Sequence, residues 1–172
     1  LETSRGCPYL CSFCLSALDK TVRFFDDRTI HQQINLLIKG GVTKIKFVDR
    51  TFNLKPSHMK ELMRWLIKFE GVAFHFEVVG DLLTNDLLDF LETVPKGMFQ
   101  FELGVQTTDQ SSQEKIKRKQ NYDIKLIENL IENIKAYSKD FCTISNIKML
   151  QETSEPRSKG GFGGKKKTKR KN

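Results

Sequence analysis

Helical and strand patterns alternate along most of this chain, and that alternation restricts the fold more than any other feature. Apolar residues recur at helical spacing in some segments and alternate with polar residues in the segments between them. The predicted elements are a helix capped by Asp26, Asp27 or Thr29 and ended by Gly40–Gly41, a strand over 43–49, a helix from Pro56 to Gly71, a strand over 72–78, a helix from Thr84 to about Pro95, a strand over 98–106, a helix after Asp123 and a short strand over 141–147. Strands that alternate with helices pair in parallel, so we predict an α/β fold, a partial (β/α) barrel of parallel strands. At about 30 residues per unit, the 172 residues have room for about four to five units.

Three of the four cysteines lie within eight residues, as Cys7, Cys11 and Cys14 in C-x3-C-x2-C spacing. Thiols this close suit a metal better than a disulfide framework. Gly6 allows the sharp turn that a loop needs in order to bring three sulfurs toward one centre. The fourth cysteine, Cys142, is an isolated residue that we interpret as a small buried side chain.

Two metal centres are consistent with the cysteine loop. A structural zinc ion takes four protein ligands, so it would need a fourth from Cys142, His31, His58 or His75. A [4Fe–4S] cluster is also held by thiolates, and three of them leave one iron open to another ligand. The residues alone leave both interpretations open, although the histidines lie in or beside predicted regular elements.

The cysteine loop and its flanks resemble the signature of radical S-adenosylmethionine (radical SAM) enzymes. The resemblance rests on the cysteine spacing, on Phe13 directly before the last cysteine and on the lead-in from Glu2 to Pro8. It is nearest to the subgroup whose larger members carry a cobalamin-binding domain. The resemblance extends to about residue 140 and implies a core of six β/α units. We therefore expect residues 1–150 to be a radical SAM core domain that is incomplete at both its start and its last strands.

The resemblance also implies which residues meet the cofactors. Cys7, Cys11 and Cys14 would hold the cluster, Phe13 would lie against adenine, Asp49 would belong to the segment that meets the methionine amino group, and Glu102 and Gln106 would approach the ribose or substrate. The segment 49–52 departs from the glycine-rich, glutamate-containing version common in the family. Because catalytic groups collect at the carboxyl ends of parallel strands, Glu77 and Asp81 are further candidates. The sequence identifies no catalytic residue.

In the resembled family, the cluster reductively cleaves S-adenosylmethionine (SAM) to a 5′-deoxyadenosyl radical that attacks the substrate. Methylation, methylthiolation and rearrangement all fit, with an unknown substrate and an electron donor such as flavodoxin or ferredoxin. Cobalamin would take part only with a separate domain. Two alternatives remain: a zinc-stabilised module that binds nucleic acid through its basic tail, and an inactive fragment of a radical SAM protein.

The basic excess of the chain belongs to its C-terminal end. Residues 157–172 hold eight of the 29 basic residues and no acid, and the remaining 21 match the 21 acidic residues. We therefore predict a neutral core domain followed by a disordered Gly/Lys-rich tail over 151–172, which either touches RNA or an import receptor or is simply solvated. A neutral body speaks against a nucleic-acid-binding core. The sequence has no long apolar run, and its clustered thiols indicate the reducing cytoplasm.

Overall fold

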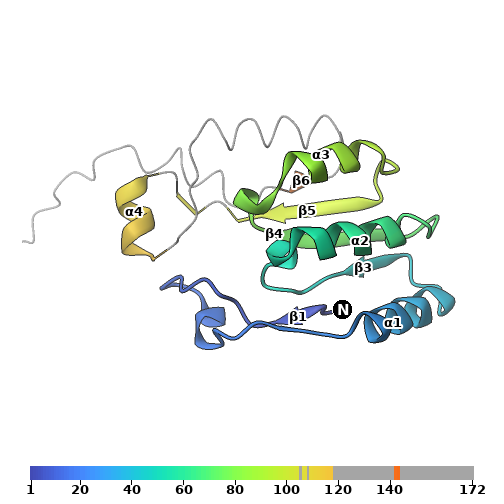
Figure 1. Cartoon of the computed structure of the whole chain (residues 1–172), viewed down its shortest axis with the longest axis horizontal. Helices are drawn as coiled ribbons and strands as arrows, with labels where there is room; N and C mark the ends of the chain where they lie inside the picture. The colour runs from blue at the N-terminus through green and yellow to red at the C-terminus, as the bar shows by residue number, and fades with distance from the viewer. Residues whose placement is uncertain (105, 108, 118–141, 144–172) are drawn as a thin grey trace, which may run out of the picture.

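A computed structural model describes residues 1–104, 106–107, 109–117 and 142–143 (Figure 1). Its main sheet is parallel, with strands in the order β3-β4-β5-β6. These strands are β3 (Lys44–Lys46), β4 (Ala73–Val78), β5 (Phe99–Leu103) and β6 (Cys142–Thr143). The helices are α1 (Asp27–Lys39), α2 (Pro56–Leu66), α3 (Asn85–Glu92) and α4 (Gln110–Lys115), with the short 3₁₀ helices η1 (Leu15–Leu18), η2 (Phe52–Leu54) and η3 (Gly80–Leu82). The predicted α/β class with parallel strands is confirmed.

The first residues of the chain lie beside the end of β3. The amino group of Leu1 donates to the carbonyl of Lys46 at 2.9 Å, and Val48 N–H donates back to Leu1 at 2.8 Å. Such a pair of backbone hydrogen bonds, from one residue to two residues of the neighbouring segment, is the pattern of parallel strands. The chain then enters β1 (Ser4–Arg5), which pairs in antiparallel fashion with β2 (Arg23–Phe24) and so closes the cysteine loop between them.

The helix ends follow the predicted capping signals. The Asp26 carboxylate accepts from Thr29 N–H at the start of α1, and the Thr84 hydroxyl accepts from Leu87 N–H at the start of α3. Gly40 caps the end of α1. Neither α4 nor the antiparallel pairing of β1 with β2 was predicted from the sequence, and the predicted helix after Asp123 lies outside the described residues. In the part of the chain that the structure describes, no helix is long and apolar enough to cross a membrane.

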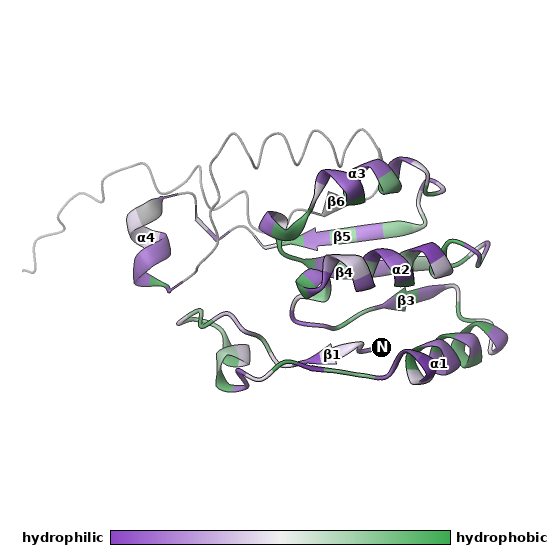
Figure 2. Ribbon diagram, in the orientation of Figure 1, coloured by the Kyte–Doolittle hydropathy of each residue, from purple (hydrophilic) through white to green (hydrophobic). Residues whose placement is uncertain are grey.

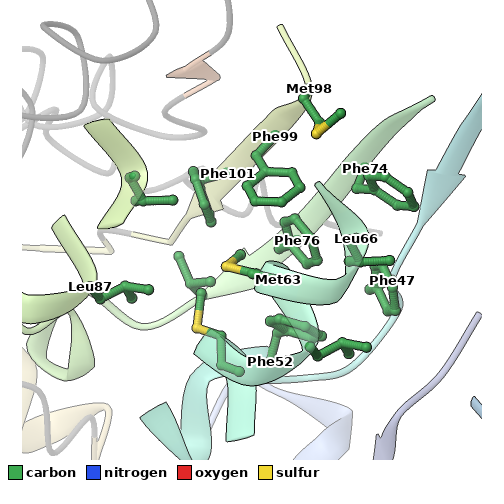
Figure 3. Close-up of a cluster of buried hydrophobic side chains, with 14 of the residues drawn as sticks. Phe47, Phe52, Met63, Leu66, Phe74, Phe76, Leu87, Met98, Phe99 and Phe101 are labelled. Atoms are coloured by element: carbon green, nitrogen blue, oxygen red, sulfur yellow. The ribbon is translucent and has the colours of Figure 1, made fainter. Parts of the chain in front are cut away.

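A cluster of phenylalanines forms the centre of the core on the helix-covered face of the sheet (Figure 3). The ring of Phe76 lies 4.5 Å from that of Phe52, 4.9 Å from Phe47, 5.4 Å from Phe99 and 5.7 Å from Phe101. Each such pair contributes about 0.5–1.5 kcal/mol beyond the burial of its area. The rings join β4 and β5 to the segment that follows β3, so the core holds that segment against the neighbouring strands.

The opposite face of the sheet is polar. Side chains alternate across a strand, so the residues between the core positions of β4 and β5 face away from the helices. The register places His75 beside Lys46 and Glu77 beside Glu102. In a closed barrel this is the inner face. Two of its residues, Glu77 and Glu102, line the same cavity as the cysteine loop.

Candidate cofactor site

The turn before the first cysteine requires glycine. Gly6 has φ +96°, and a Cβ there would lie 2.2 Å from the Thr21 carbonyl oxygen. No side chain tolerates both the left-handed backbone and that contact. Directly afterwards, Cys7 N–H donates to the Asp19 carbonyl at 2.9 Å and closes the base of the loop. The loop between β1 and β2 is therefore fixed at its entry.

The three thiols of the loop differ in their exposure. Cys7 and Cys11 are buried, Cys14 is exposed, and no disulfide joins them. Burial opposes ionisation of the Cys14 thiol, but hydrogen bonds with Ser16 and the charge of Arg50 outweigh it, so the pKa of Cys14 is lowered. A lowered pKa favours the thiolate, which is the form that binds metals.

The cysteine loop faces a cavity of about 260 Å³ at the carboxyl ends of the parallel strands. It is lined by Cys7, Tyr9, Cys11, Phe13, Cys14 and Ser16 of the loop, Arg50 and Thr51 after β3, Glu77, Val78 and Val79 at the end of β4, and Glu102, Gly104 and Gln106 from β5 onward. Two apolar side chains of this loop, Leu15 and Leu18 of η1, are more than four-fifths exposed, and Figure 2 colours much of this segment as hydrophobic. Four segments far apart in the sequence thus meet around one cavity.

The segment after β3 is held by two fully buried polar side chains. The Asp49 carboxylate accepts hydrogen bonds from the backbone and hydroxyl groups of Thr3 and Ser4, at 2.6–3.1 Å. The Asn53 amide bonds both the N–H and the carbonyl of Val79, at 2.9 and 2.7 Å. Asp49 therefore ties the loop after β3 to the first strand segment, and Asn53 ties it to the end of β4.

An ion-pair network forms the wall contributed by β4 and β5. The Lys46 ammonium lies 3.3 Å from Glu77 and 3.6 Å from Glu102, whose carboxylate is also 3.3 Å from His75 Nε2. Burial lowers the pKa of Lys46, but the two carboxylates outweigh it and the pKa is raised. Burial and the charge of Lys46 lower the pKa of His75, which keeps that ring neutral. Lys46 thus offsets the repulsion between two carboxylates that lie directly opposite each other.

The predicted site residues are brought together with one exception. Phe13, Glu102 and Gln106 line the cavity with the three cysteines, as does the further candidate Glu77. Asp49 does not line it, because its carboxylate points to Thr3 and Ser4 instead. The prediction that Asp49 contacts a cofactor therefore finds no support in the structure. Asp81, the other candidate, lies exposed in η3 and also outside the lining.

The cavity is also lined by Tyr9, Ser16, Arg50 and Thr51, none of which was singled out from the sequence, although the segment 49–52 that contains Arg50 and Thr51 was a candidate. For Arg50 and Thr51 a signal existed, because they directly follow a predicted strand and the carboxyl ends of strands carry sites. Nothing in the sequence distinguished them from Asp49, since the direction of each side chain depends on hydrogen bonds to residues about 45 positions away.

The thiols fit a cluster better than a single ion. In the described part of the chain, no group of three or more His, Cys, Asp or Glu side chains converges on one metal position, as structural zinc requires. A cluster instead binds each thiolate through a different iron, and here three thiols of one loop share a cavity with room beyond them. The histidines are engaged elsewhere: His31 stacks on Trp65 at 4.0 Å, and His58 lies 3.6 Å from Asp27.

A parallel α/β sheet with a three-cysteine loop and a cavity at its carboxyl edge defines a barrel-type core whose cavity lies where such folds carry their functional sites. The sequence agrees with this class, because residues 1–158 match the Radical SAM superfamily. The chain belongs to the radical SAM superfamily, as its cysteine signature predicted.

Two curated relatives are methyltransferases. A cobalamin-dependent radical SAM methyltransferase, TokK of Streptomyces tokunonensis, is 36% identical over 61 residues. The 2-(S-pantetheinyl)-carbapenam-3-carboxylate methyltransferase of Streptantibioticus cattleyicolor is 33% identical over 61 residues. Each match covers 34% of this chain and 9% of the relative.

The fold is shared with a solved structure, the radical SAM methyltransferase TsrM of Kitasatospora setae. One structure with tryptophan and a SAM analogue bound gives a TM-score of 0.67 at 17% identity over 80% of this chain. A second, with cobalamin and a [4Fe–4S] cluster bound, gives the same score and identity. This chain spans 28% and 26% of those two chains, respectively.

Proposed function

We propose that this chain is the cofactor-binding core of a radical SAM enzyme, in which Cys7, Cys11 and Cys14 hold a [4Fe–4S] cluster and the adjoining cavity binds SAM. The observation that carries the proposal is the shared lining of that cavity, where the three thiols meet polar residues from the ends of β4 and β5. When bound, the cluster supplies the electron that divides SAM into methionine and a 5′-deoxyadenosyl radical.

The residues around the cavity take separate roles in this proposal. Phe13 is half exposed and lines the cavity beside the last cysteine, which suits an aromatic contact with adenine. Glu102 and Gln106 supply hydrogen-bonding groups for the ribose or the substrate. The apolar side chains of Val78 and Val79 line the cavity at the end of β4 and would limit the access of water to a bound ligand.

Methyl transfer is the reaction that the relatives favour, since both curated matches and the solved structure are methyltransferases. TokK is cobalamin-dependent, and one of the TsrM structures has cobalamin bound. We propose cobalamin as a second cofactor that a separate domain would hold. A one-electron donor such as flavodoxin or ferredoxin would reduce the cluster, and the thiol chemistry suits the reducing cytoplasm.

Anaerobic reconstitution with iron and sulfide tests the proposal. The wild type is expected to bind about four irons per chain, with a reduced-state EPR spectrum that changes when SAM is added. The variant Cys14→Ala removes one ligand and is expected to lose most of the bound iron. Cys142→Ala is the matched control, because this cysteine belongs to β6 and not to the loop.

Three other outcomes would each count against the proposal in a different way. Tight zinc without a cluster would restore the zinc-stabilised binding module. A cluster whose spectrum ignores SAM would indicate an inactive fragment. Equal iron contents in Cys14→Ala and Cys142→Ala would show that the loop is not the cluster site.

A further inference from the structure

One basic side chain, that of Arg50, is exposed and lines the cavity together with the three thiols. Within the described residues, no aspartate or glutamate lies at ion-pair distance from its guanidinium, whereas Lys46 in the same region is paired with Glu77 and Glu102. The thiol end of the cavity therefore presents a positive charge, and the β4–β5 end presents paired acids.

The backbone that carries Arg50 is held on both sides. Asp49, directly before it, is fully buried and bonded to Thr3 and Ser4, and Asn53 is fully buried and bonded to Val79. Residue 50 is thus fixed in place while its own side chain stays available to a ligand. A group held in this way loses less entropy when it binds a partner.

A guanidinium is shaped for one kind of ligand. Its planar fork of N–H donors matches a carboxylate in a two-point contact, which is stronger than a bond between neutral groups. Under the proposed function, the ligand of this cavity is SAM, whose methionine part ends in a carboxylate. We propose that Arg50 receives the methionine carboxylate of SAM, an inference that rests on the proposed function.

The assignment differs from the expectation for this segment, in which Asp49 belonged to the region that meets the methionine amino group. Here the acidic residue is used inside the fold, and the basic residue beside it faces the cavity. The competing role for Arg50 is to balance the negative charge that three thiolates bring to the cluster. That role would not depend on which ligand is bound, so the two roles can be separated by experiment.

The test measures anaerobic equilibrium binding of SAM and of S-adenosylmethioninamine, which lacks the carboxylate, to the reconstituted chain. The decisive quantity is the ratio of the two dissociation constants, compared between wild type and Arg50→Gln. Any contact of the carboxylate other than that with Arg50 would contribute equally in both proteins and would cancel from the comparison. For one charge-assisted contact, Arg50→Gln is expected to weaken SAM binding by about 10- to 100-fold and to change analogue binding less than about 3-fold.

Two further variants complete the design. Arg50→Lys keeps the charge without the fork and is expected to lose about 3- to 10-fold in SAM affinity. Arg28→Gln removes an exposed arginine of α1 outside the cavity lining, and it is expected to bind both ligands as the wild type does. Iron content is measured for every variant.

The outcomes separate the inference from the proposed function. Equal weakening of both ligands by Arg50→Gln, or weakening of neither, would overturn the inference while the cluster and SAM binding stand. Failure of the wild type to build a cluster that binds SAM would overturn the proposed function and the inference together. A selective loss of SAM affinity, with iron content unchanged, is the expected result.

Discussion

Replacing Asp49 with Asn removes the charge from a fully buried side chain, beside the cavity-lining Arg50, that accepts five hydrogen bonds. One carboxylate oxygen accepts from the backbone and hydroxyl groups of both Thr3 and Ser4, and the other accepts again from Thr3 N–H at 3.0 Å. In the variant, the amide NH₂ would face Thr3 N–H and that bond would be lost. The contribution of each remaining hydrogen bond to stability would fall from about 1.5–3 kcal/mol, as for a charged acceptor, to about 0.5–1.5 kcal/mol, as for a neutral one.

Part of this loss is offset, because a neutral amide is less costly to bury than a carboxylate. The net decrease in the free energy of unfolding is therefore expected to be about 2–4 kcal/mol, a large share of the 5–15 kcal/mol typical of a domain. Urea unfolding of the cluster-free chain measures it, and the midpoint is expected to fall by about 1–2 M.

Asp89→Asn is the matched control, since Asp89 is exposed on α3, and it is expected to change stability by less than about 0.5 kcal/mol. The variant Thr3→Ala/Ser4→Ala is expected to be non-additive with Asp49→Asn, because these residues share one network. If the free energy of unfolding of Asp49→Asn lies within about 0.5 kcal/mol of the wild-type value, Asp49 does not anchor the first strand segment.

Two further predictions concern Gly6 and His75. Gly6→Ala is expected to destabilise the fold by more than about 1 kcal/mol and to lower the iron content after reconstitution, because the added Cβ would meet the Thr21 carbonyl. The control Gly41→Ala has a similar φ but open space around its Cβ, so it is expected to keep the wild-type iron content. Equal iron contents in the two variants would contradict this prediction. The pKa of His75 is lowered in the folded state, by burial and by Lys46, so the unfolded state binds the proton more readily. Stability is expected to be greatest above about pH 6.5 and to fall as the pH drops below that value. His75→Gln should flatten this part of the urea-midpoint profile, and an unchanged slope would argue against the assignment.

The fold could be predicted from the sequence where local chemistry decides it. Asp26 and Thr84 cap their helices as expected, and the alternation of Phe99 and Phe101 with polar neighbours marks both a strand and its buried face. The helix α4 and the pair β1–β2 are too short to show a period, so no local pattern revealed them.

The site was predictable in its position and less so in its individual side chains. The cysteine spacing located the loop, and strand ends located Glu102 and Gln106 at the cavity. Asp49 and Arg50 are neighbours at the end of one strand, and either could have faced the cavity. The choice depends on donors supplied by Thr3 and Ser4, which the fold brings near from the start of the chain.

Within residues 49–53, the side chains that stabilise the fold are different from the side chain that faces the cavity. Asp49 and Asn53 carry the bonds that hold the neighbouring strand ends, and Phe52 belongs to the core. The Arg50 side chain forms no ion pair with the described residues, and it contributes its charge and shape to the cavity. A single codon at this position therefore alters the electrostatics of the cavity while the surrounding architecture is retained, which gives both natural divergence and protein engineering a site where ligand preference changes with little effect on folding.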